Sequence, residues 1–161
     1  MITYTIKKGR HYSTPRLFKL WFKSKPLSYR ISFDQSCRYD IGAEQGDINK
    51  LFGIGFIWHH QDSARFGWVY NKEADKIDIY AYCYVDGKRI AELFYSCGFD
   101  RSYDFTIEPH FGSYIFKVRG TTVYTKEIKH FHTKNICYPL MPYFGGNTKA
   151  PHDVKIYMKP L

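Results

Sequence analysis

The segment Lys76–Val85 alternates between two kinds of side chain, and this alternation constrains the fold more than any other feature. Side chains along a β-strand point to opposite faces with a period of two. A strand that reads this way buries one face, so we expect its small apolar row to lie in the core of a β-sheet protein. That row consists of Ile77, Ile79, Ala81, Cys83 and Val85.

Similar strand-like segments recur along most of the chain, about ten residues apart. Turn-forming pairs such as Asp86-Gly87 and Arg119-Gly120 separate several of them. Only Gln35–Lys50 reads as a looser polar stretch, with room for a short helical turn. The predicted strands are Ile2–Lys7, Arg16–Phe22, Leu27–Asp34, Leu51–Trp58, Arg65–Tyr70, Lys76–Val85, Arg89–Tyr95, Tyr103–Glu108, Ser113–Arg119, Thr122–Ile128, Ile136–Tyr138 and Val154–Lys159.

This pattern predicts an all-β protein, a two-sheet antiparallel jelly-roll sandwich with little or no helix. The chain has 161 residues, which suits one domain over residues 1–161. Its 15 Tyr and 13 Phe place it far from the aromatic-poor composition of disordered chains. We find no linker, internal repeat or low-complexity segment.

The formal net charge of +9 favours polyanions as partners, at least through nonspecific attraction. Lys and Arg are nevertheless interspersed with Asp and Glu, as they are on the surface of an ordinary soluble basic domain. No basic helix, arginine-rich tail or zinc-finger spacing concentrates the charge. Both interpretations therefore stay open at this point.

The four cysteines, at positions 37, 83, 97 and 137, lie far apart and form no C-x-x-C pair. A thiolate zinc site is therefore not expected, and Cys83 is expected to be a buried free thiol. The N-terminal residues do not read as a signal peptide, and free thiols favour synthesis in the cytoplasm. An exported protein whose leader has been removed is the alternative. No apolar run approaches the ~18–20 residues of a membrane span, so none is expected.

The second face of the segment Lys76–Val85 is the first candidate binding surface. It carries Asp78, Tyr80, Tyr82 and Tyr84. Flat rings with hydroxyl tips stack on sugars or bases and donate hydrogen bonds as well, which suits a binding face. The alternative is aromatic packing beneath a covering segment, either Gln35–Lys50 or Pro139–Asp153.

A polar turn between two predicted strands is the second candidate. It places Trp58, His60, Arg65 and Trp68 on the rim of the tyrosine face. Imidazoles beside a carboxylate can bind a metal. Adjacent residues of a strand point to opposite faces, however, so His59 and His60 are not expected to chelate one ion. A polar rim for a ligand and a hydrogen-bonded structural turn are the remaining interpretations.

The third candidate is the segment Tyr138–Asp153, from which Tyr143 and Asn147 are the predicted ligand contacts. Its prolines restrict the backbone, and Gly145-Gly146 permits tight geometry. The backbone N–H groups of this glycine pair could approach an anion. The alternative is an ordered crossover that covers one end of the sandwich.

The run Phe111–Gly120 resembles the strand–turn pattern Y-x-F-x-V-x-G of concanavalin A-like lectin and glucanase domains. Pro142–Gly146, followed by a final strand, is similar to the last crossover of some members of that superfamily. The resemblance implies two stacked antiparallel sheets with a ligand on the concave face. These motifs cover a minority of the chain and are common in β-proteins.

Glucanases of that superfamily carry E-x-D-x-x-E on a concave strand, and the nearest match here, Asp75–Ala81, lacks both glutamates. Glycoside hydrolysis needs two carboxyl groups roughly 5–10 Å apart. Asp104 and Glu108 share a strand face but are separated by about 13 Å along a strand. No G-x-S-x-G, phosphate-binding loop or H-E-x-x-H motif is present. Catalysis, cofactors and metals are therefore not expected, although a Cys–His pair assembled in space stays open.

The function expected from the sequence is non-catalytic carbohydrate binding by a lectin-like sandwich, with a glycan on the tyrosine face. The first alternative is a structural or interaction protein, such as a virion or appendage component that forms homo-oligomers. The second alternative is a basic binder of polyanions or nucleotides.

Overall fold

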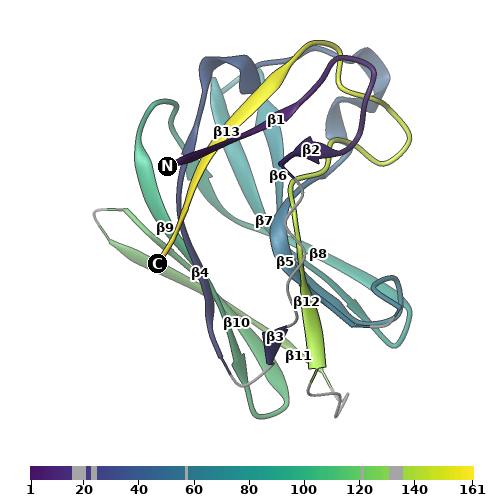
Figure 1. The fold of residues 1–161 in the computed structure, drawn as a ribbon, viewed down its shortest axis with the longest axis vertical. Helices are drawn as coiled ribbons and strands as arrows, with labels where there is room; N and C mark the ends of the chain where they lie inside the picture. The colour runs from purple at the N-terminus through teal and green to yellow at the C-terminus, as the bar shows by residue number, and fades with distance from the viewer. Residues whose placement is uncertain (16–20, 23–24, 57, 121, 131–135) are drawn as a thin grey trace.

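Two antiparallel sheets stack face to face in the computed structural model, which describes residues 1–15, 21–22, 25–56, 58–120, 122–130 and 136–161 (Figure 1). The predicted all-β, jelly-roll-like sandwich is confirmed. Helix is confined, among the described residues, to the short 3-10 turns η1 (Gln35–Cys37) and η2 (Gly42–Gly46). Both lie in the stretch predicted to be looser and polar.

Within the described residues, one sheet has seven strands and the other has six. The first runs in the order β11 (Val123–Lys129), β10 (Ser113–Arg119), β9 (Ser102–His110), β4 (Leu27–Phe33), β13 (Val154–Pro160), β1 (Ile2–Ile6) and β2 (Ser13–Thr14). The second runs in the order β3 (Trp21–Phe22), β12 (Ile136–Leu140), β5 (Asn49–Gly55), β6 (Ser63–Asn71), β7 (Lys76–Val85) and β8 (Lys88–Cys97).

The core forms between the inner faces of the two sheets. Ile77, Ile79, Ala81 and Cys83 of β7 are fully buried, and Val85 packs against them while partly buried. The small apolar row predicted from the sequence is thus confirmed. Aromatic rings join the two sheets across the interior. Ring centroids lie 5.0 Å apart for Phe66–Phe105, 4.8 Å for Tyr29–Phe52 and 5.7 Å for Phe33–Trp68.

The position of Trp68 corrects one expectation. This residue was predicted on the rim of the binding face, but its side chain is fully buried between the sheets. The reason is strand parity, because Arg65 and Trp68 are three residues apart in β6 and must point to opposite faces. Trp68 therefore belongs to the core and offers no surface to a ligand.

Most strand bounds agree with the sequence prediction to within two residues, and those of β7 and β10 are identical to it. The two-residue strand β2 was missed, because its pairing with β1 leaves no alternation in so short a segment. The predicted strand Arg16–Phe22 lies mostly outside the described residues, with β3 at its end. β5 ends at Gly55, so Trp58 lies in the following turn.

A two-residue turn, Asp86-Gly87, joins β7 to β8 as predicted. Both residues have positive φ, 50° for Asp86 and 75° for Gly87, which matches the twist of a hairpin. The turn sets the register in which Val85 pairs with Lys88 and Tyr82 pairs with Ala91. It thereby determines which side chains of β8 stand beside the tyrosine row.

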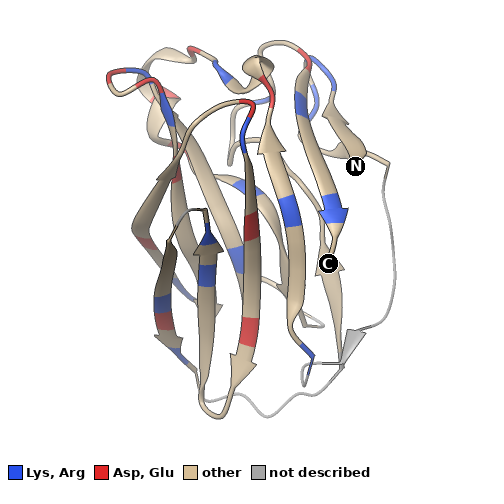
Figure 2. Cartoon of the chain, turned by 90° about the vertical axis from the view of Figure 1, so that its left-hand side faces the viewer, with Lys and Arg blue, Asp and Glu red and all other residues tan. Residues whose placement is uncertain are grey.

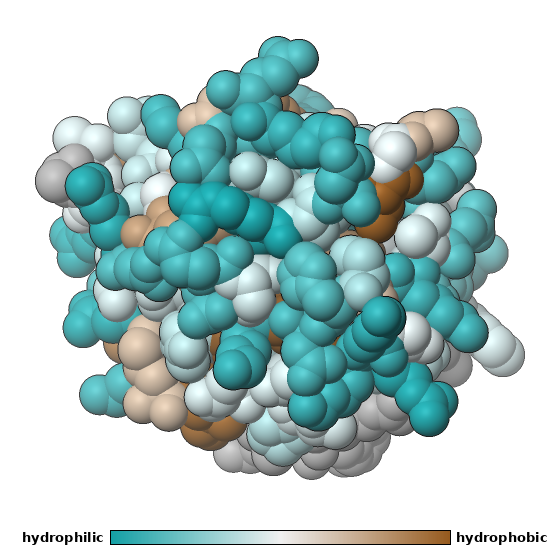
Figure 3. Space-filling view, turned by 90° about the horizontal axis from the view of Figure 1, so that it is seen from above, coloured by the Kyte–Doolittle hydropathy of each residue, from teal (hydrophilic) through white to brown (hydrophobic). Residues whose placement is uncertain are grey.

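Two further expectations concern membrane spans and the cysteines. Among the described residues, no helix has the length and apolar character needed to cross a bilayer. All four cysteines are buried, none forms a disulfide with another, and Cys83 is confirmed as a buried free thiol. At the end of the sandwich that is uppermost in Figure 1, apolar patches are small and separated by hydrophilic side chains (Figure 3).

Candidate ligand-binding face

The outer face of the seven-stranded sheet is dominated by charges that neutralise one another. Arg30 of β4 lies opposite Asp104 of β9 and donates two hydrogen bonds to its carboxylate, at 2.7 and 2.9 Å. Lys117 of β10, which is paired with Thr106, donates one hydrogen bond diagonally to Glu108 of β9. Acidic and basic segments are interspersed on these strands in Figure 2. The two carboxylates considered for hydrolysis are therefore both engaged in ion pairs.

The outer face of the six-stranded sheet is different, because the register gathers aromatic and cationic side chains there. Arg65 of β6 pairs with Tyr82 of β7 on one side and with Gly53 of β5 on the other. One step along, Ser63 lies opposite Tyr84, and Gly55 lies opposite Tyr138 of β12. We call Lys50, Arg65, Tyr82, Tyr84, Tyr138 and Tyr143 the Arg65 cluster.

Two glycines allow these side chains to lie flat on the sheet. A Cβ atom at Gly53 would stand 2.6 Å from Cα and 2.8 Å from Cγ of Arg65. A Cβ atom at Gly55 would stand 3.1 Å from Cζ of Tyr138 and from Cβ of His59. The absence of a side chain at both positions is thus what makes room for Arg65 and Tyr138.

Arg65 is a buried cation that has no counterion among the described residues. Only 7% of the surface of Arg65 is exposed, and its Nε and Nη2 atoms have no hydrogen-bond acceptor among the described residues. The guanidinium carbon lies 5.8 Å from the ring centroid of Tyr82. Burial lowers the pKa of Arg65, and the neighbours that oppose this are tyrosines and a cysteine. An unpaired buried ion costs several kcal/mol, so such an arrangement calls for an explanation.

Lys50 brings a second cation to the same place. Its Nζ lies 5.3 Å from the ring centroid of Tyr82 and 5.8 Å from that of Tyr143, and it donates to the carbonyl of Gly145 at 3.0 Å. Burial, together with repulsion from Arg65, lowers its pKa to about 8, against an opposing contribution from Asp47. Two desolvated cations therefore share one aromatic surface.

Further rings extend the cluster toward the turn after β5. The rings of Tyr82 and Tyr84 meet edge to face at 5.8 Å, and those of Tyr84 and His60 at 5.3 Å. His59 Nδ1 lies 3.0 Å from the hydroxyl of Tyr138. Trp58 is 69% exposed in this turn. The tyrosine row is thus partly covered, since Tyr82 is only 4% exposed while Tyr84 and His60 reach the solvent.

The expectation that His59 and His60 diverge is wrong. They lie in a turn rather than a strand, and their ring centroids are only 4.4 Å apart. No third ligand joins them, since the described residues contain no group of three or more His, Cys, Asp or Glu side chains suited to a metal. The pair therefore contributes rings and hydrogen bonds to the rim.

Tyr143 enters the cluster from the segment that precedes β13. Its backbone exchanges hydrogen bonds with Lys50 at 2.8 and 2.9 Å, which ties this segment to β5. Its ring stacks on His11 at 5.0 Å and meets Tyr12 edge-on at 4.9 Å. The prediction missed Lys50, Tyr138 and His11, because only the spatial pairing of distant segments brings them to this face.

Four further predictions, two from the loop before β13 and two from β7, have different outcomes. The N–H groups of Gly145 and Gly146 donate to Asn49 and Asp47, so they are already engaged within the protein. Asn147 is exposed on this loop. Asp78 accepts hydrogen bonds from Asn71 and Ser96, at 2.9 and 2.6 Å, and thus serves the sheet itself. Tyr80 is partly buried beside Gly67.

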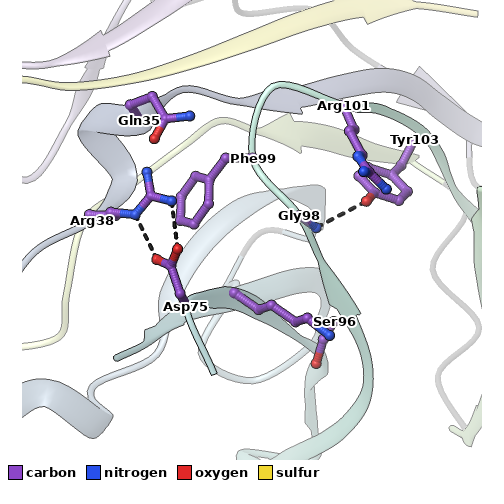
Figure 4. A pocket seen from close by; sticks show the side chains of 9 residues that line it. Gln35, Arg38, Asp75, Ser96, Gly98, Phe99, Arg101 and Tyr103 are labelled. Carbon is purple, nitrogen blue, oxygen red and sulfur yellow. Dashed lines mark hydrogen bonds and ion pairs between the residues drawn. The ribbon is translucent and has the colours of Figure 1, made fainter. Parts of the chain in front are cut away.

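A hollow of about 450 Å³ lies elsewhere, at one end of the sandwich, where Gln35, Lys76 and Arg101 contribute to its wall (Figure 4). Its central charges already have partners. Arg38 donates to Asp75 at 2.6 and 2.8 Å, and its guanidinium carbon lies 3.8 Å from the ring centroid of Phe99. The ion pair at the centre of the hollow is thus satisfied within the protein, whereas Arg65 is not paired among the described residues, and the Arg65 cluster is the stronger candidate.

Comparisons of the sequence with known families and curated proteins give no match. No protein-family model matches the chain, and no curated protein matches its sequence.

Proposed function

We propose that this protein is a non-catalytic carbohydrate-binding module, and that its glycan lies on the outer face of the six-stranded sheet. The observation that carries the proposal is the Arg65 cluster, in which several tyrosine rings surround cationic donors on one face. Tyrosine rings offer apolar surface to the C–H face of a sugar and hydroxyl groups to its oxygens.

The partial burial of the row indicates which rings would touch the sugar. Tyr82 forms the base of the cluster, while Tyr84, His60 and Trp58 present accessible surface around it. Tyr143 closes the other side. The jelly-roll-like sandwich and the resemblance of Phe111–Gly120 to concanavalin A-like domains support the same assignment, since those domains also use one sheet face.

The arrangement of carboxylates on the outer face of the six-stranded sheet favours binding of a glycan over its hydrolysis. Asp78 is engaged with Asn71 and Ser96, and no second carboxylate accompanies it on β7. Hydrolysis of a glycosidic bond requires a pair of carboxyl groups around one bond.

The proposal is tested by screening the purified protein on a glycan array and measuring the best ligand by calorimetry. Tyr84→Ala should weaken binding about five- to tenfold, because it removes a stacking ring at low cost to the core. Phe111→Ala is the matched control, since Phe111 is fully exposed in the turn between β9 and β10. A blank array, or equal losses in the two variants, would contradict carbohydrate binding at this face.

A further inference from the structure

We propose that the ligand of this face carries an anionic group, a carboxylate or a sulfate, which pairs with Arg65, so that the glycan is acidic. This inference rests on the proposed function and specifies its substrate class. Its basis is Arg65, a residue that is only 7% exposed and whose guanidinium nitrogens Nε and Nη2 are buried without acceptors among the described residues.

Among the residues that the structure describes, the neighbours of Arg65 supply hydroxyl groups and rings, and none forms an ion pair with it through a carboxylate. Ser63, two residues earlier on the same face of β6, has a buried hydroxyl that likewise lacks a partner among the described residues. The neighbours that influence the charge state of Arg65 are Tyr82, Tyr84, Tyr138 and Cys83. An oxyanion would accept hydrogen bonds from the guanidinium and the hydroxyl together.

Lys50 reinforces the same preference. Its ammonium group lies 5.3 Å from the centroid of the same Tyr82 ring and is repelled by the charge of Arg65. A bound anion would be attracted by both cations and would relieve their mutual repulsion. The paired charges on the opposite sheet offer no comparable site, because Arg30 and Lys117 already have carboxylate partners.

The shape of the cluster favours one anionic group over a polyphosphate chain. Nucleic acids are held by rows of exposed Lys and Arg that track the backbone. Here the cations are Lys50, which is partly buried, and Arg65, which is only 7% exposed, and both lie beside tyrosine rings. An acidic sugar matches this arrangement, with its charged group at Arg65 and its ring against Tyr84.

The test compares ligands that differ only in charge. Calorimetry is carried out with a galacturonic acid oligomer, with the neutral galactose oligomer obtained from it by carboxyl reduction, and with a sulfated galactose oligomer of equal length. We expect at least one acidic oligomer to bind about tenfold more tightly than the neutral one. The two acidic arms distinguish a carboxylate from a sulfate.

Arg65→Met is the diagnostic variant, because it keeps an apolar side chain of similar length against Tyr82. It should weaken binding of the acidic oligomer by a much larger factor than binding of the neutral one, so that the preference for the acidic oligomer is lost. Lys117→Met removes a cation from the outer face of the other sheet and is the control. Thermal unfolding of both variants establishes that they fold.

A second measurement does not depend on glycan binding. The side-chain Nε–Hε resonance of Arg65 is followed by NMR while sodium acetate or sodium sulfate is added to the wild-type protein. Saturable shifts at Arg65 support the anion site. Equal binding of neutral and acidic oligomers, together with an unperturbed Arg65 resonance, overturns the anionic group while leaving carbohydrate binding intact.

Absence of binding to every oligomer instead overturns the proposed function, and with it the acidic glycan. Tighter binding of a single-stranded oligonucleotide than of any glycan, with a steep dependence on salt, also overturns the inference in favour of a polyanion.

Discussion

Arg65 lies between Gly53 and Tyr82, so that its guanidinium rests against an aromatic ring on one side of β6 while its aliphatic stem occupies the space above a glycine on the other. The burial of this cation thus depends on a residue that has no side chain. Several consequences can be measured.

Gly53→Ala should destabilise the protein by about 1–3 kcal/mol, because the added Cβ collides with backbone atoms of Ala64 and Arg65 rather than with a movable side chain. Urea unfolding measures the effect. Gly46→Ala is the matched control, since a Cβ there meets nothing within 4 Å and should change stability little. Equal destabilisation of both variants would show that the space above Gly53 is not limiting.

Lys50 should give the protein an unusual gain in stability at alkaline pH. Its pKa falls from 10.5 to about 8 on folding, so the unfolded chain binds more protons between those values and stability rises with pH across that window. Below about pH 8 the penalty for burying the charged amine is present in full. Lys50→Met should remove this rise, which is on the order of 1 kcal/mol after allowance for solvent screening.

The difference between wild type and Lys50→Met isolates this effect, because tyrosines titrate in the same range. Charges around Lys50 come from Arg65, Arg89 and Asp47, all retained in the variant. Urea unfolding at intervals between pH 7 and pH 10 provides the data. Parallel stability curves for the two proteins would contradict the lowered pKa.

The four cysteines should resist alkylation in the folded state. All are buried, and desolvation raises the pKa of Cys37, Cys83 and Cys97, so little reactive thiolate is present. Iodoacetamide at pH 8, followed by mass spectrometry, should modify none of them before unfolding and all four after it. Rapid labelling of one thiol in the native protein would indicate local opening at that strand.

Phe66→Ala should cost about 3–5 kcal/mol, which approaches the whole stability of a typical domain. Phe66 is fully buried and its ring contacts Phe52, Phe105 and Phe116, which joins the two sheets. Phe111→Ala, at a fully exposed position, should change the free energy of unfolding by less than about 0.5 kcal/mol. Chemical denaturation of the two variants gives the comparison.

The fold could be predicted because its signal is local. The alternation in Lys76–Val85 and the turn Asp86-Gly87 each specify their own structure, and both agree with the sandwich. The burial of Trp68 also follows from a local rule, because a residue three positions from Arg65 in a strand points to the opposite face.

The candidate site could be predicted only in part, because it is assembled from distant segments. Arg65, Tyr82 and Tyr84 lie on two adjacent predicted strands and were proposed as ligand contacts. Lys50 and Tyr138 join them through the pairing of β5 with β6 and β12, which no local pattern encodes. His59 and His60 lie in the predicted polar turn, where neighbouring side chains need not point to opposite faces, so the strand rule applied to this pair gave the wrong directions.

The pairing of β1 with β13 also bears on how the protein is made. β1 has β13 and β2 as its partners in the sheet, and its register places Ile2 opposite Met158 and Ile6 opposite Val154. During translation the first strand must therefore wait until residues 154–160 have left the ribosome before it can dock. Until then the edge of β4 that later receives β13 stays open, and a chaperone that shields unpaired strands would act on the nascent chain at this point.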